Sequence, residues 1–177
     1  NLFKDKHPTP PFGGRGGLSP TLFGILFAVL PFCYLILFNF SEGWYNSEIV
    51  LGFFFLIWAN DTFAYLVGRA IGKTKLFERI SPKKTWEGTL GGVLCTQGIA
   101  YLLSNYFPSI EPIHWHMIAV IVSVFGTLGD LVESMIKRSL GVKDSGTILP
   151  GHGGILDRFD GVLIAAPFVV AYLMLIR

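Results

Sequence analysis

Long apolar segments separated by basic loops constrain this chain more than any other feature. No charged side chain occurs from Leu22 to Phe40, which as a helix at about 1.5 Å per residue would extend for about 28 Å. Four further apolar spans follow at about 49–72, 88–107, 114–133 and 160–176. Only 15% of the residues are charged, against about 25% in soluble domains, and the mean hydropathy is +0.55. The sequence therefore predicts an all-α integral membrane protein with about five transmembrane helices.

The loops between these spans differ in their content of lysine and arginine. Basic residues occur before the first span, between the second and third, and between the fourth and fifth, whereas the turns 41–47 and 108–113 have none. The positive-inside rule then predicts that residues 1–20, 69–87 and 133–158 lie in the cytoplasm. We expect one membrane-embedded domain over 1–177, without linker or repeat, in a bacterial inner membrane. The net charge of +2 says little about partners, and no nucleic-acid partner is expected.

A dense polar block, Gly129–Gly161, separates the last two spans. Asp130, Ser134 and Lys137 are spaced to share one helical face, and Asp157 and Asp160 are spaced i,i+3. Hard oxygen ligands without a Cys or His cluster favour Mg²⁺ over zinc, and Mg²⁺ sites commonly include substrate phosphates. The block therefore predicts a polar active site for a metal and phosphate at the cytoplasmic side. Its other charged or ligand-forming residues are Glu133, Arg138, Lys143, Asp144, His152 and Arg158.

Several residues of the block have more than one interpretation. Glu133 is spaced i,i+4 from Lys137, so a simple surface ion pair is the alternative to a functional role. Asp144 could orient the neighbouring Lys143 or bind substrate. His152 lies between glycines and could be a ligand, a general base or a structural hydrogen-bonding residue.

Asp61 interrupts the second apolar span. Ionisable residues within membrane spans are energetically costly, so each is a candidate functional residue. Helical spacing predicts that Asp61, Tyr65, Gly68 and Gly72 share a face. The alternatives are a polar residue that packs against another helix, or a residue already at the cytoplasmic rim.

The segment Ser81–Gly88, SPKKTWEG, predicts a helix start with Ser81 as the cap and Pro82 in the first turn. The free N–H groups of such a start bind anions. Lys83 and Lys84 would then lie against the helix dipole, an arrangement that a bound phosphate would neutralise. The alternative is a pair of lysines that meet acidic lipid headgroups.

The segment from Ser134 to Asp160, SMIKRSLGVKDSGTILPGHGGILDRFD, closely resembles the signature of the phosphatidate cytidylyltransferases, also called CDP-diacylglycerol synthases. Three other segments also look like that family: NDTFAYLVGRAIGK, SPKKTWEGTLGG and GDLVES. The resemblance covers most of 49–177. Family members are usually longer, with further hydrophobic spans ahead of this region, so we expect that N-terminal transmembrane helices of the family are missing.

The resemblance implies transfer of CMP from CTP to phosphatidic acid, giving CDP-diacylglycerol and pyrophosphate in phospholipid biosynthesis. It also implies Mg²⁺, with K⁺ as a second metal, at Asp130, Asp157 and Asp160. We expect Asp130, Lys137 and Asp157 to be catalytic. Candidates for binding the substrates are Ser81, Lys83, Lys84, Arg138, Lys143, Asp144, His152 and Arg158. The partners would be CTP, phosphatidic acid and the lipid bilayer.

Three alternatives stay open at this point. A related CTP-dependent membrane enzyme could act on an isoprenoid lipid or a polyprenol. An ion transporter would use Asp61 and Asp130 as intramembrane ion sites. The chain could also be an inactive fragment if the missing spans are required. Finally, Gly88 and Gly92 form a GxxxG pair suited to close helix packing, which permits a homodimer.

Overall fold

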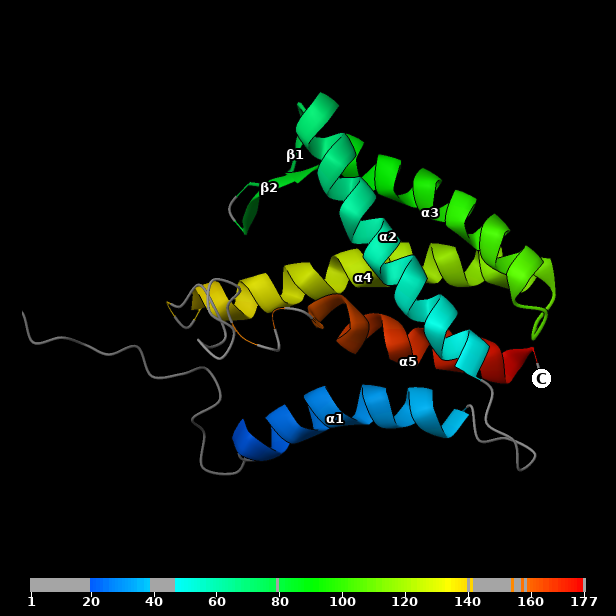
Figure 1. Cartoon of the computed structure of the whole chain (residues 1–177). Coiled ribbons are helices and arrows are strands. Elements are labelled where there is room, and N and C mark those ends of the chain that lie inside the picture. The colour runs from blue at the N-terminus through cyan, green and yellow to red at the C-terminus, as the bar shows by residue number, and fades with distance from the viewer. Residues whose placement is uncertain are drawn as a thin grey trace, which may run out of the picture.

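The computed structural model describes residues 20–38, 47–78, 80–139, 141, 154, 157 and 159–176. Within them the chain forms five helices and one short hairpin (Figure 1). In chain order these are α1 (Pro20–Phe38), α2 (Ser47–Ile71), β1 (Lys75–Phe77), β2 (Ser81–Thr85), α3 (Trp86–Tyr106), α4 (Pro112–Ser139) and α5 (Asp160–Leu175). A helix is thus confirmed at each apolar span. By length and composition, α2 and α4 could each cross a membrane, as expected of a membrane protein.

The helices run side by side, with α4 and α5 in the middle of the assembly (Figure 1). α2 packs mainly on α3, α4 packs on both α3 and α5, and α1 lies on the outside against α5. The end of α2, the start of α3, the end of α4 and the start of α5 all meet at the hairpin end of the bundle (Figure 1). The polar segments of the sequence are therefore brought together at one end.

The core is a continuous apolar cluster between α2, α4 and α5. Phe53 and Leu56 of α2, Trp115 and Val122 of α4, and Val169 of α5 are completely buried. The Trp115 indole N–H donates to the carbonyl of Phe107 at 3.1 Å, so its one polar group has a partner. This packing holds together α4 and α5, whose ends carry the first and last residues of the polar block, 129–139 and 160–161.

Glycines allow α2 and α3 to approach closely. A Cβ atom at Gly88 would lie 2.6 Å from the carbonyl oxygen of Ala64, and one at Gly92 would lie 2.9 Å from the Ala64 Cβ. The prediction that this GxxxG pair mediates close helix packing is confirmed. The pair packs inside the chain, so it gives no support to a homodimer, which stays a prediction.

The prediction that Ser81 caps a helix is wrong. Residues 81–85 form strand β2, which pairs antiparallel with β1 (Lys75 opposite Thr85). Thr85 is the actual cap: its backbone is extended, and its hydroxyl accepts from Gly88 N at 3.1 Å. Lys83 and Lys84 consequently precede the helix in an extended strand and do not oppose its dipole. Both Ser81 and Thr85 can cap a helix, and pairing with β1 favours the later start.

A second set of contacts closes the base of the hairpin. Trp86 N donates to the Thr74 carbonyl at 3.0 Å, and Thr74 N donates to both carboxylate oxygens of Glu87, at 3.1 and 3.2 Å. Hydrogen bonds from its own backbone N–H and from Thr74 hold the pKa of Glu87, which precedes the apolar part of α3, below its usual range. The hairpin is thereby anchored where the chain leaves α2 and enters α3.

Candidate active site

A cavity of about 630 Å³ lies at the hairpin end of the bundle. One side of it comes from α2 and the hairpin, and the other comes from α4 and the beginning of α5. Both acidic and basic residues line it: Asp61, Asp130, Asp157 and Asp160, together with Arg69, Lys75, Lys83 and Lys84. A concave site with convergent charged groups of both signs is typical of a binding site for a phosphorylated ligand.

A close crossing of α4 and α5 places two of the acids on this cavity. A Cβ atom at Gly129 would lie 2.6 Å from the Asp160 carbonyl oxygen and 3.0 Å from the Gly161 Cα. Only glycine permits this approach, because any side chain would overlap the backbone of α5. Asp130, the next residue on α4, and Asp160, the first residue of α5, therefore line the same space.

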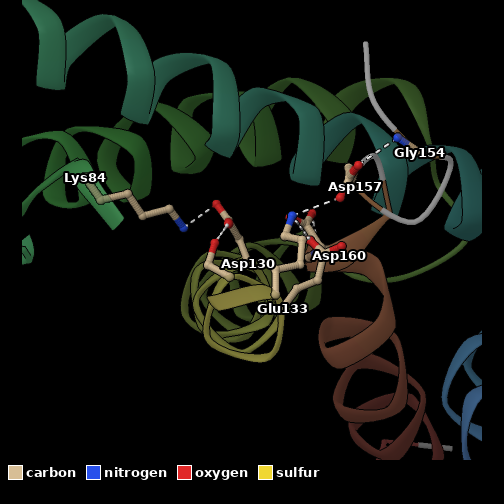
Figure 2. A network of polar contacts seen from close by, with 9 residues as sticks. Lys84, Asp130, Glu133, Gly154, Asp157 and Asp160 are labelled. Carbon is tan, nitrogen blue, oxygen red and sulfur yellow. Dashed lines mark hydrogen bonds and ion pairs between the residues drawn. The ribbon is translucent and has the colours of Figure 1, made fainter. Parts of the chain in front are cut away.

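Asp130 forms an ion pair with a lysine of the hairpin. Lys84 Nζ lies 2.6 Å from Asp130 Oδ2, and it also donates to the Thr127 carbonyl at 3.4 Å (Figure 2). The other carboxylate oxygen accepts from the Ser134 hydroxyl at 3.2 Å. The predicted common face of Asp130 and Ser134 on α4 is thus confirmed. The ion pair connects the hairpin to α4 across the cavity.

A second network lies where α4 meets the segment before α5 (Figure 2). Lys137 Nζ donates to Asp157 Oδ1 at 2.9 Å and to Glu133 Oε2 at 3.2 Å. The other oxygen of Asp157 accepts from Gly154 N at 2.7 Å. Glu133 is 4% exposed, so the interpretation as a simple surface ion pair is wrong. Asp157 lines the cavity, whereas Lys137 and Glu133 are not among its lining residues.

The exposed side chain of Asp61 lines the cavity and is not buried in the core. Tyr65 and Gly68, which share its helical face, also line the cavity. This confirms the predicted common face for these three residues, whereas Gly72, the fourth, follows the end of α2 and is not among the lining residues. It also disfavours the alternative of a polar residue buried against another helix, a description that suits the neighbouring Asn60 better, at 2% exposed.

The remaining predicted residues divide into three groups. Ser81 and Lys83 line the cavity, and Arg138 is exposed near the end of α4 but is not among the lining residues. Four predicted residues lie outside the described part of the chain: Lys143, Asp144, His152 and Arg158.

Sequence reasoning missed two cationic residues of the cavity, Arg69 and Lys75. Arg69 lies one turn after Tyr65, and its guanidinium donates to the Tyr65 hydroxyl at 3.4 Å. The helical periodicity that found Tyr65 could have found it. Lys75 belongs to the hairpin, which the sequence did not predict.

The donor set suits a hard cation that binds together with a substrate. Mg²⁺ prefers carboxylate oxygens, and it usually takes only one or two from the protein, with water and substrate phosphates as the other ligands. Four carboxylates on one cavity provide such donors. Among the described residues, no three His, Cys, Asp or Glu side chains are grouped closely enough to hold a metal by themselves. Magnesium at Asp130, Asp157 and Asp160 therefore stays a prediction.

Comparison with known proteins gives consistent matches. Residues 17–176 match the model of the cytidylyltransferase family. The phosphatidate cytidylyltransferase of Staphylococcus aureus strain COL is 51% identical over 131 residues, which are 73% of this chain and 49% of that protein. Proteins of the same name from Staphylococcus epidermidis and Staphylococcus saprophyticus are 48% and 49% identical over the same shares. The chain thus spans about half the length of the curated relatives it matches.

Proposed function

Because this chain belongs to the cytidylyltransferase family, we propose that its cavity serves the transfer of CMP from CTP to phosphatidic acid, which yields CDP-diacylglycerol and pyrophosphate. The observation that carries this proposal is the pairing of cationic and carboxylate walls around one cavity. The cationic wall can bind phosphates, and the carboxylate wall can bind the cation that accompanies a nucleotide. The names of the relatives supply the lipid and the nucleotide.

The proposed reaction requires little covalent help from the protein. A phosphate oxygen of phosphatidic acid attacks the α-phosphorus of CTP, and the bond from that phosphorus to the oxygen bridging to the β-phosphate breaks. Pyrophosphate leaves with the electron pair of that bond. The nucleophile is already an anion, so no strong base is needed. Catalysis then consists mainly of positioning and charge neutralisation.

The cationic wall would hold the phosphates. Lys83 and Lys84 on β2, Lys75 on β1 and Arg69 on α2 line the cavity and can donate charge-assisted hydrogen bonds to phosphate oxygens. The opposite wall would hold Mg²⁺ at Asp130, Asp157 and Asp160, with K⁺ as a second ion. When bound, the metal supplies positive charge that neutralises the nucleotide phosphates and the leaving pyrophosphate.

The proposed arrangement in the membrane follows from the charge pattern. All five helices would cross a bacterial inner membrane, with the cavity open to the cytoplasm. CTP would enter from water, while the acyl chains of phosphatidic acid stay in the bilayer. A homodimer remains a prediction, and sedimentation in detergent would test it. Its interface would have to involve surfaces other than Gly88 and Gly92, which pack against α2.

The direct test is an assay of CMP transfer by the protein purified in detergent. We expect labelled CTP and Mg²⁺ to convert phosphatidic acid into CDP-diacylglycerol, and Asp130→Asn to abolish this conversion. Glu111→Gln is the matched control, because Glu111 is exposed and lies about 28 Å along the chain direction of α4 from Asp130.

A panel of lipid acceptors separates the remaining alternatives. Conversion of a polyprenol or an isoprenoid lipid in preference to phosphatidic acid would replace the proposed substrate. Ion flux in liposomes without any use of CTP would contradict the proposal and favour a transporter.

A further inference from the structure

The buried pair of Glu133 and Lys137 lies one layer behind the cavity. Glu133 is 4% exposed, and the Lys137 side chain is 18% exposed. Glu133 Oε2 accepts from Lys137 at 3.2 Å. Neither residue is among those that line the cavity.

A buried ion pair of this kind contributes little to the stability of a protein. Removing a carboxylate and an ammonium from water costs more than their attraction usually returns, and well-packed apolar residues often stabilise a protein better. The position of this charge pair in a largely apolar bundle therefore calls for a role beyond packing.

The contacts of Lys137 lead toward the cavity. A lysine ammonium has three N–H donors, and two of them are directed at Glu133 and Asp157. Both oxygens of Asp157 have partners, one on Lys137 and the other on Gly154 N. The contacts therefore link Glu133 to Lys137 and Lys137 to Asp157, and of these three only Asp157 lines the cavity.

We propose that Glu133 and Lys137 are positioning residues, which hold the Asp157 carboxylate in place and do not contact the substrate. This inference rests on the proposed function, because it assigns a support to one of the residues of that site. Glu133 fixes the Lys137 ammonium, and Lys137 fixes one oxygen of Asp157 while the backbone at Gly154 fixes the other. The direct phosphate contacts then fall to the basic residues that line the cavity, among them Lys75, Lys83 and Lys84.

Lysine acylation, read residue by residue with mass spectrometry, tests this assignment on the intact protein in detergent. Addition of CTP and Mg²⁺ should slow the reaction of Lys83 and Lys84 with acetic anhydride and leave the rate at Lys137 unchanged. Protection of Lys137 by CTP to the same degree as Lys83 would overturn the proposal. This measurement needs no variant, so it holds even if substitutions at Glu133 prevent folding.

Substitution of Glu133 provides the second arm. In Glu133→Gln the loss of one charged partner should raise the acylation rate of Lys137 about 10-fold, with Lys83 as the internal reference. We expect kcat for CMP transfer to fall about 10- to 100-fold, as is typical when a supporting contact of a site residue is lost, with KM for CTP unchanged. Glu133→Asp, which keeps the charge, should recover part of that loss, and the control Glu111→Gln should change neither quantity.

The proposed function and the proposed support of Asp157 by Glu133 and Lys137 would fail in different ways. If wild-type protein transfers no CMP and CTP protects no lysine, the proposed function fails, while the effect of Glu133→Gln on Lys137 acylation still tests the support. If wild-type protein is active but Glu133→Gln leaves the acylation of Lys137 unchanged, or raises KM for CTP with kcat unaltered, the support is refuted and the proposed function stands.

Discussion

Replacement of Lys84 by methionine should separate the stability of the protein from its activity. The Lys84 ammonium lies 2.6 Å from the Asp130 carboxylate, but the two side chains are still 24% and 36% exposed. Partly solvated ion pairs contribute about 0–1 kcal/mol to the free energy of unfolding. Methionine also retains most of the apolar stem of lysine. Because 1 kcal/mol shifts the Tm of a domain of this size by about 2–4 °C, we expect Tm to fall by no more than that.

The loss of activity should be much larger. If Lys84 donates to a phosphate oxygen in the transition state, the substitution removes a hydrogen bond to a charged group, which contributes about 1.5–3 kcal/mol. Since about 1.4 kcal/mol corresponds to a factor of ten, kcat/KM for CTP should fall about 10- to 150-fold. The contrast between a small change in Tm and a large change in kcat/KM is the signature of a group that acts on the substrate.

The assay is CMP transfer from labelled CTP to phosphatidic acid in detergent, with thermal unfolding measured on the same samples. Lys73→Met is the matched control, because Lys73 is exposed, follows the end of α2 and is not among the residues that line the cavity. It should change neither quantity. Retention of activity within a factor of about two in Lys84→Met, or a parallel loss of activity and Tm in excess of the small contribution of the pair, would refute the reasoning.

Three further predictions concern the packing and the hairpin. Gly88→Ala should lower the free energy of unfolding by about 1–3 kcal/mol, because the added Cβ would meet the backbone of α2. Gly98→Ala in the same helix is the control: a Cβ there has nothing within 4 Å, so this substitution should be neutral or stabilising. Thermal unfolding of the two variants compares them. Thr85→Val should cost about 0.5–2 kcal/mol through loss of the α3 cap, also measured by unfolding. Because the pKa of Glu87 is below its ordinary value of 4.5, its carboxylate stabilises the fold above that pH, so the Tm difference between wild type and Glu87→Gln should shrink as the pH falls below 4.5.

Helix periodicity predicted much of the site because the apolar spans leave the backbone little alternative to a helix. Once the helix is given, side chains four residues apart must lie on one face, which places Asp61 with Tyr65 and Asp130 with Ser134. The meeting of the polar segments at one end of the bundle also agrees with the alternation of basic loops (Figure 1). Each of these properties depends only on neighbours in the chain or on the sequence of spans.

The features that sequence reasoning missed depend on contacts between distant segments. Ser81 and Thr85 are both acceptable caps, and only the pairing of β1 with β2 selects the second. The burial of Glu133 likewise depends on how closely the start of α5 approaches α4, which is governed by the absence of a side chain at Gly129. The spacing of Glu133 and Lys137 predicted their ion pair correctly but could not tell whether water surrounds it.

The charge of the cavity indicates that a nucleotide would bind there together with a cation. Among the residues that the structure describes, four carboxylates line the cavity against four basic side chains, so this part of the lining is formally neutral. Lys84 is already paired with Asp130. A nucleoside triphosphate brings several negative charges into this space. Binding it without further cations would therefore leave carboxylates and phosphates facing each other, which is strongly unfavourable at short range. A divalent cation that arrives with the nucleotide would remove this repulsion, and it would allow Lys84 to exchange Asp130 for a phosphate oxygen. On this reasoning CTP alone should protect Lys83 and Lys84 from acylation far less than CTP with Mg²⁺.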